Sequence, residues 1–165
     1  AFITFMTKST EGLETILAAG GIVDVNAGTP WEELKKDYPI VDQDNSALEI
    51  STVGSTSVEK VVQAGLEAFQ PLAGNFQMRM NQTGSGDGWK RVLGDEKDGP
   101  NKGDIGFASR YFHEDEVTDK SDMTGLLCQD AIVVVTHKDN PVKNLTKAQL
   151  YDIFTAVVAN WEDIK

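Results

Sequence analysis

The sequence predicts an α/β fold, with a mixed but mostly parallel sheet flanked by helices. From residue 48 onward, strand-like and helix-like segments alternate, which is typical of sheets with parallel members. Apolar residues between Val58 and Phe69 recur with the 3.6-residue period of a helix. Residues 131–136 (AIVVVT) are almost wholly apolar, as expected of a central strand that is covered on both faces.

Residues 1–25 predict a helix followed by a short edge strand. Ser9 or Thr10 is expected to cap the helix, which Gly20 ends. Residues 22–25 alternate between apolar and polar side chains like an edge strand. The apolar face of the helix, which we expect to pack against the sheet, consists of Leu13, Ile16 and Leu17.

A polar segment separates this helix from the alternating part of the chain. Residues 26–47 contain two prolines and predict a linker, with one short helix at residues 31–36. Leu48 to Ile50 then begin the first strand of the sheet, and the helix at residues 58–69 follows it.

The remaining elements follow in order. Phe76, Met78 and Met80 alternate as in a strand, and a glycine-rich turn then opens a helix around residues 89–93. A third strand is expected at residues 105–109. After the apolar strand, a last helix begins at Asn144 or Thr146.

The composition of the chain predicts a globular domain and argues against some classes of binding partner. The chain has 165 residues, 40% of them hydrophobic and 25% charged, so one ordinary domain can bury a core. A formal net charge of −11 argues against nucleic acid and anionic membranes as partners. No apolar stretch reaches the roughly 18 residues that cross a bilayer, and no signal peptide opens the chain.

The single cysteine and the two histidines predict no cofactor or metal. Cys128 cannot form a disulfide within the chain, and it is expected to be a buried small hydrophobic residue. His113 and His137 are distant from each other in the sequence and do not match a metal-ligand spacing. No nucleophile–base pair or pair of carboxylates indicates an enzyme.

Three turns at strand ends are candidates for binding an anion. The turn Gly54-Ser55-Thr56-Ser57 leads from a strand into a helix, whose first N–H groups are free to bind an anion. The alternative is that Thr56 or Ser57 only caps the helix.

The second candidate turn is Gly84-Ser85-Gly86-Asp87-Gly88. Three glycines in five residues let the backbone approach a ligand closely. The spacing matches neither a Walker loop nor a dinucleotide-binding motif. A purely structural turn is the alternative.

The third candidate follows the third strand. Ser109 offers a hydroxyl group, and the planar guanidinium of Arg110 suits an oxyanion. The alternative is a solvated arginine, since arginine is rarely buried. All three turns lie where α/β sheets bind ligands, beyond the carboxyl ends of strands.

Five blocks in this order resemble the phosphate-binding proteins that serve ABC importers. The resemblance implies the first lobe of a two-lobed, periplasmic-binding-protein-like fold that closes on its ligand. The blocks are GSTSVEKVV from residue 54, GSGDGWK from 84, GDIGFASR from 103, DAIVVVTHKDNPVKNLTKAQLYDIFT from 130 and NWEDI from 160. The phosphate-binding residues that it implies are Gly54, Ser55, Thr56, Ser57, Ser85, Gly86, Ser109 and Arg110.

The sequence departs from the family pattern in three ways. Some relatives carry an aspartate where Arg110 stands, and arginine cannot accept a hydrogen bond from a protonated phosphate oxygen. The family's second-lobe motif, an arginine followed by a Ser-Gly-Thr turn, is not in the chain. Residues 1–25 resemble the family's C-terminal end, which suggests a tandem or permuted member.

The resemblance implies four segments. Residues 1–25 would be the C-terminal-type helix and strand of a preceding unit that packs on the lobe, and residues 26–47 a linker. Residues 48–136 would form the solute-binding lobe, and residues 137–165 the hinge exit and the start of the second lobe.

These observations predict a binding protein rather than an enzyme. It would capture phosphate, or a similar tetrahedral oxyanion, outside the cell or in the periplasm and deliver it to a membrane ABC permease. The parent protein would be anchored to the membrane, as in a lipoprotein, although this segment does not itself insert. The alternative is a sensing or adhesion module with the same fold.

Overall fold

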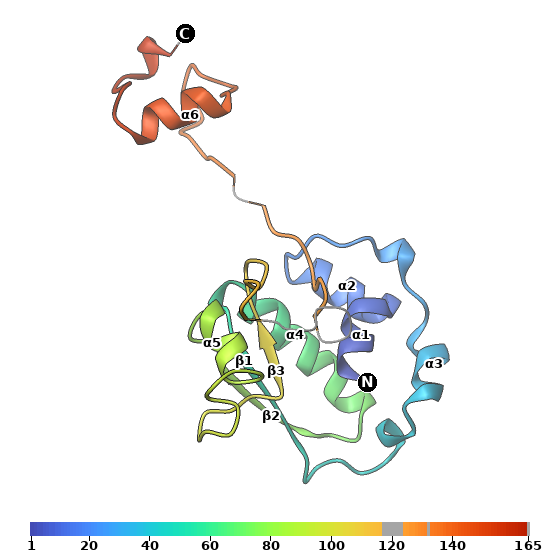
Figure 1. Cartoon of the computed structure of the whole chain (residues 1–165). Coiled ribbons are helices and arrows are strands. Elements are labelled where there is room, and N and C mark those ends of the chain that lie inside the picture. Colours follow the sequence, from blue (N-terminus) through green and yellow to red (C-terminus); the bar gives the residue numbers. More distant parts are fainter. Residues whose placement is uncertain (117–123, 132, 165) are drawn as a thin grey trace. The chain divides into compact units, whose positions relative to one another are not determined.

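The computed structural model describes residues 1–116, 124–131 and 133–164 (Figure 1). The chain divides into two compact units, Ala1–Asp130 and Ala131–Lys165. The candidate turns all belong to the first unit.

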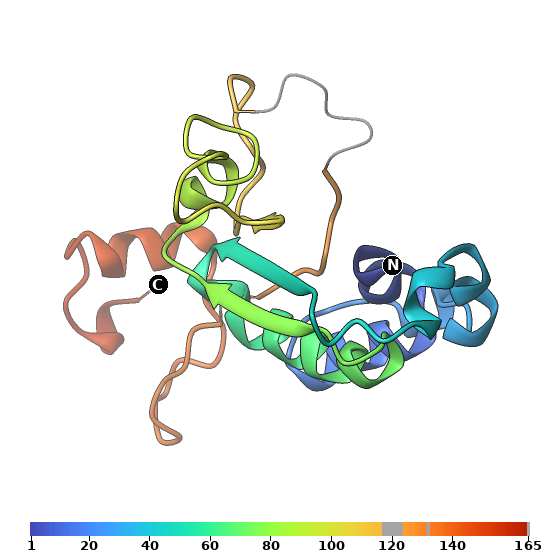
Figure 2. The ribbon, with the colours of Figure 1, turned by 90° about the horizontal axis from the view of Figure 1, so that it is seen from below.

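A three-stranded parallel sheet lies in the first unit. Its strands are β1 (Glu49–Gly54), β2 (Gln77–Asn81) and β3 (Ile105–Phe107), in the order β2-β1-β3. Residues Glu49 and Gln77 are partners in the first pair, and Gly54 and Phe107 are partners in the second. Figure 2 shows β1 and β2 side by side and pointing the same way. The predicted α/β class is confirmed, and both strand pairs of this sheet are parallel.

Helices flank this sheet. The amphipathic helix α4 (Glu59–Phe69) forms where the period predicts it, and α5 (Ser85–Lys90) lies against β1 and β3. Two N-terminal helices, α1 (Phe2–Lys8) and α2 (Thr10–Ala18), pack against α4 (Figure 1). The short α3 (Trp31–Leu34) lies between α2 and β1 in the sequence. Short 3₁₀ turns occur at Val25–Ala27, Lys35–Asp37, Pro39–Asp42, Thr56–Val58 and Gln70–Leu72.

The hydrophobic core joins segments that are distant in the sequence. The rings of Phe5 in α1 and Phe69 in α4 have centroids 5.0 Å apart, and Trp31 lies edge-on to both at 5.5 Å. Ile16 and Leu66 are fully buried beside them. Burying each such side chain contributes roughly 1.5–3 kcal/mol, so α1 and α2 both contribute side chains to the core.

The N-terminal segment partly follows prediction. Ser9 caps α2, since its Oγ accepts the N–H of Gly12 at 2.8 Å and donates to the carbonyl of Phe5 at 2.7 Å. The expectation that Leu17 is buried is wrong, because its side chain is 53% exposed.

The predicted edge strand at residues 22–25 is also wrong. Ile22 forms only an isolated antiparallel bridge with Gln129. The carboxylate of Asp24 accepts the N–H of Asn26 at 3.0 Å, which starts the 3₁₀ turn Val25–Ala27. A side chain that hydrogen-bonds two residues ahead competes with strand pairing.

The predicted central strand at residues 131–136 is wrong where the structure describes it, and residue 132 lies outside the described residues. Residues 133–136 belong to no strand, and Val133 and Val135 are 74% and 86% exposed. An apolar run becomes a buried strand only where neighbouring strands and helices cover it. Cys128 is partly buried and packs against the core of the first unit.

The second unit contains one helix, α6 (Lys147–Phe154), and a 3₁₀ turn at Trp161–Asp163 among the residues described there. Thr146, one of the two predicted starts, caps α6 through a capping box with Gln149. Over the described residues, no helix is long and apolar enough to cross a membrane.

Candidate anion-binding site

The three predicted turns meet at the carboxyl ends of β1 and β3. The N–H of Ser55 donates to the carbonyl of Phe107 at 2.9 Å, which joins the first turn to the third. The N–H of Gly84 donates to the carbonyl of Gly54 at 2.7 Å, which joins the second turn to the first. Parallel strands place such turns at one edge of the sheet, and here the backbone hydrogen bonds hold them together.

Glycines allow this close approach. Gly54 has φ +118°, and a Cβ atom there would lie 2.1 Å from the carbonyl oxygen of Phe107. A Cβ on Gly88 would lie 2.4 Å from the same oxygen, and one on Gly106 would lie 1.9 Å from the carbonyl oxygen of Gly88. A side chain at Gly54 would push β1 away from β3, and one at Gly88 or Gly106 would separate α5 from β3.

Two serine side chains face each other across the edge. The hydroxyl oxygens of Ser85 and Ser109 are 3.2 Å apart, and the N–H of Ser109 donates to Ser85 Oγ at 3.1 Å. Ser85 is half-buried and Ser109 is exposed. The second and third turns thus place two hydroxyl groups together at the surface.

The first turn combines a cap with exposed donors. Ser55 is buried, and its Oγ accepts the N–H of Ser57 at 3.2 Å, so the cap is Ser55, and not Thr56 or Ser57 as the capping alternative expects. Thr56 and Ser57 are exposed. Among the described residues, neither of these two hydroxyl groups takes part in a hydrogen bond.

Part of the glycine-rich turn is helical, which corrects the predicted helix at residues 89–93. The helix α5 begins at Ser85 and ends at Lys90. The N–H of Asp87 donates to the carbonyl of Gly84 at 3.1 Å, and an acidic residue in the first turn favours helix formation. Gly86 lies in open space, since a Cβ there would meet nothing within 4 Å.

Arg110 is already paired. Its Nη1 and Nη2 donate to the two carboxylate oxygens of Glu116 at 2.6 and 2.7 Å, and Nη1 also donates to the carbonyl of Tyr111 at 3.0 Å. Glu116 accepts the N–H of His113 at 2.8 Å as well. The hydrogen bond from Arg110 is the main reason that the pKa of Glu116 falls to about 2, and the His113 N–H adds to it. The guanidinium of Arg110 therefore already binds the two oxygens of a carboxylate, and this carboxylate belongs to Glu116 of the same chain.

Sequence reasoning missed a second group beside the glycine-rich turn. The side chains of Thr83, Asp87 and Arg91 contact one another. The four-residue spacing of Asp87 and Arg91 is the signal that could have revealed their contact, because residues at i and i+4 share one face of a helix.

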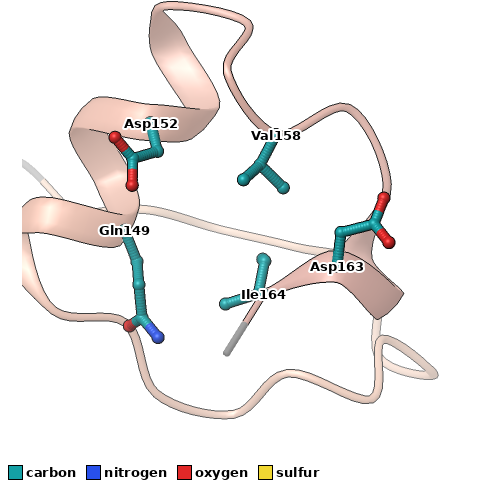
Figure 3. Close-up of a pocket in the computed structure, with 5 residues that line it drawn as sticks. All are labelled: Gln149, Asp152, Val158, Asp163 and Ile164. Carbon is teal, nitrogen blue, oxygen red and sulfur yellow. The ribbon is translucent and has the colours of Figure 1, made fainter.

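A cavity in the second unit does not fit an anion. It has a volume of about 150 Å³ and is lined by Gln149, Asp152, Val158, Asp163 and Ile164. Figure 3 shows the side chains of Val158 and Ile164 pointing toward one another in this hollow. Its two carboxylates oppose a negative ligand. Within the described parts of the chain, no cluster of histidine, cysteine or acidic residues fits a metal ion.

A profile of the PBP superfamily domain matches residues 14–165. The chain belongs to the PBP superfamily. The match covers more than nine-tenths of the sequence, and it includes all three turns.

Named relatives of this PBP-superfamily chain are binding proteins. It is 29% identical over 154 residues to "Phosphate-binding protein PstS 2" of Streptococcus agalactiae serotype V, a match that covers 92% of this chain and 49% of that protein. It is 31% identical over 116 residues to the protein of the same name from Streptococcus pneumoniae serotype 4, covering 70% and 37%. The chain thus spans about half the length, or less, of the curated relatives that it matches.

A solved structure shows the same fold. It is the crystal structure of a phosphate-binding protein of a phosphate ABC transporter from Streptococcus pneumoniae TIGR4. The TM-score is 0.73 at 25% identity, and the match covers 99% of this chain and 56% of that chain. These relatives are named as binding proteins and not as enzymes, as the sequence predicts for this member of the PBP superfamily.

Proposed function

We propose that this chain supplies one side of a cleft that binds phosphate or a similar tetrahedral oxyanion. The observation that carries the proposal is the contact between the hydroxyl groups of Ser85 and Ser109. This contact lies at the edge of the sheet where β1 ends at Gly54. The names of the relatives support phosphate as the ligand.

The chemistry of the turns fits an oxyanion. The hydroxyl groups of Thr56, Ser57, Ser85 and Ser109 are neutral donors that can each bind a phosphate oxygen. Neutral donors act at close range, so a chain with a net charge of −11 can still bind a small anion. Arg110 would exchange its carboxylate partner for a ligand oxyanion, because both present two oxygens to the guanidinium.

We also assign the segments by this function. Residues 48–136 would form most of the binding lobe, and residues 137–165 would be the hinge exit and the start of a second lobe. Residues 26–47 would be a linker after a C-terminal-type segment at residues 1–25. The site would be completed by the second lobe, outside the cell or in the periplasm. A membrane-anchored parent protein would deliver the anion to an ABC permease.

The test is a phosphate titration of the ¹⁵N-labelled chain followed by NMR. One lobe holds only part of the donors, and each charge-assisted hydrogen bond contributes roughly 1.5–3 kcal/mol. Losing several weakens binding by orders of magnitude, so we expect millimolar affinity, with shifts at residues 54–57, 84–86, 109 and 110. No shifts there at tens of millimolar phosphate would contradict the anion site, whereas micromolar binding by this chain alone would contradict a shared cleft.

A longer protein that carries the second lobe tests the same site at high affinity. We expect phosphate to bind tightly by calorimetry, and Arg110→Ala to remove most of that affinity. Tight anion binding without binding to an importer would favour the sensing or adhesion module instead.

A further inference from the structure

Arg91 lies next to the proposed site and is mostly buried. Its side chain is 12% exposed, which is unusual for arginine unless it is paired. Nη1 donates to Thr83 Oγ1 at 3.0 Å, Nη2 lies 3.3 Å from Asp87 Oδ2, and Nε lies 3.4 Å from Glu96 Oε2. Thr83 Oγ1 also donates to Asp87 Oδ2.

These contacts enclose the glycine-rich turn. Thr83 precedes Gly84 and Ser85, Asp87 lies in the first turn of α5, and Glu96 follows the helix. The guanidinium therefore connects the chain on both sides of the turn. Its own backbone is fixed too, because the carbonyl of Arg91 accepts the N–H of Gly103 at 3.0 Å, just before β3.

The ion pair between Arg91 and Asp87 also changes the electrostatics of the turn. Asp87 lies in the first turn of α5, two residues after Ser85, so its carboxylate adds negative charge to the segment that carries the proposed site. A like charge a few ångströms away weakens anion binding by about fivefold in bulk water and by more near a protein surface. The guanidinium of Arg91 reaches the same oxygen, Oδ2, that accepts from Thr83, and its positive charge offsets that of the carboxylate.

We propose that Arg91 is a positioning residue for the proposed oxyanion site. It fixes the turn that carries Gly84, Ser85 and Gly86, and it neutralises Asp87 so that this turn accepts a negative ligand. The inference rests on the proposed function, and it adds a residue that does not itself touch the anion.

The test combines the two halves of the ion pair. In a phosphate titration by NMR at low salt, Arg91→Gln should weaken binding about five- to tenfold, because Asp87 keeps its charge. Adding Asp87→Asn to Arg91→Gln should restore affinity to within about twofold of the wild type. A merely structural role predicts the opposite, since the double variant has lost more contacts. Arg91→Lys, which keeps the positive charge, should lose less than Arg91→Gln.

A matched control is Arg79→Gln. Arg79 is also paired with a carboxylate, with Nε 2.7 Å from Glu49 Oε1, but it lies on β2. Arg79→Gln makes the same change in charge as Arg91→Gln, so the phosphate affinity should stay within about twofold of the wild-type value.

A second readout needs no ligand. Without phosphate, amide hydrogen exchange at residues 84–88 should be faster in Arg91→Gln than in the wild type. Unchanged exchange, or a double variant as weak as Arg91→Gln, would overturn the inference and leave the anion site standing. If Arg91→Gln does not fold, Asp87→Asn decides alone: it should raise phosphate affinity, and an unchanged or lower affinity overturns the inference. A wild type that shows no phosphate shifts overturns both proposals.

Discussion

Ser109 donates its backbone N–H to the hydroxyl oxygen of Ser85 at 3.1 Å, although the two residues are 24 positions apart in the sequence. The bond connects the chain after β3 with the first residue of α5. The backbone contacts of Ser55 and Gly84 hold the same edge from the other side. The turns are therefore held together by hydrogen bonds within the chain itself.

The first prediction separates the two serines. Ser85→Ala removes the acceptor of the Ser109 N–H, whereas Ser109→Ala keeps that backbone donor and its acceptor. A net hydrogen bond contributes about 0.5–1.5 kcal/mol, and this one is exposed, so we expect Ser85→Ala to lower the free energy of unfolding by less than about 1 kcal/mol. Hydrogen exchange at Ser109 should be faster in Ser85→Ala only. Equal exchange in both variants would contradict this bond.

The second prediction uses three glycines in different surroundings. Gly54 combines φ +118° with a close carbonyl, Gly84 has φ +139° but open space, and Gly86 has open space without a positive φ. Alanine should therefore destabilise most at Gly54 and by about 1–3 kcal/mol at Gly84, from backbone strain alone. At Gly86 it should be neutral or slightly stabilising, because alanine favours helix. Urea denaturation gives this order, and similar values at all three positions would disprove it.

The third prediction concerns two adjacent residues of α2. Ile16 is fully buried, and Leu17 is 53% exposed. Ile16→Ala should lower the free energy of unfolding by about 2–5 kcal/mol, whereas Leu17→Ala should change it by less than about 1 kcal/mol.

Deleting residues 1–25 should lower the melting temperature sharply. An unchanged melting curve after this deletion would show that the N-terminal helices are not part of the core.

The fourth prediction follows from Glu116. Its pKa is about 2 in the folded chain, below the ordinary value of 4.5. A lowered pKa stabilises the folded state above pH 4.5, and this contribution is lost as the pH falls from about 4.5 to 2. Carboxyl NMR should give a midpoint near 2 for Glu116, and Arg110→Gln should raise it toward 4.5. A midpoint that Arg110→Gln leaves in place would show that Arg110 is not its cause.

The sequence predicts the strands β1, β2 and β3 and the helix α4 well because their signals are local. Ser9 identifies its helix by capping, and the apolar period between Val58 and Phe69 suits only a helix. The helix α1 is missed because its residues FITFMTK include several with strand propensity. Tertiary packing overrides that propensity, since Phe2, Phe5 and Met6 have the spacing of one helix face and are all buried.

The candidate site is predictable in part. Strand-end turns in a parallel sheet meet by topology, so Gly54, Ser85 and Ser109 can be grouped without a structure. The partner of Arg110 cannot be inferred, because it is set by how residues 111–116 fold back on it. The exposed apolar residues 133–135 show a second limit of the sequence. Hydrophobicity indicates that a segment favours burial, but it does not indicate which other segment covers it.

The N-terminal helices have a consequence for how the protein is made. Residues 2–16 are synthesised before Leu66 and Phe69, which cover them and follow them by fifty residues or more. Translation adds about 5–20 residues per second, so the rings of Phe2 and Phe5 stay in water for several seconds. The completion of α4, rather than of the sheet, is the event in synthesis that ends their exposure.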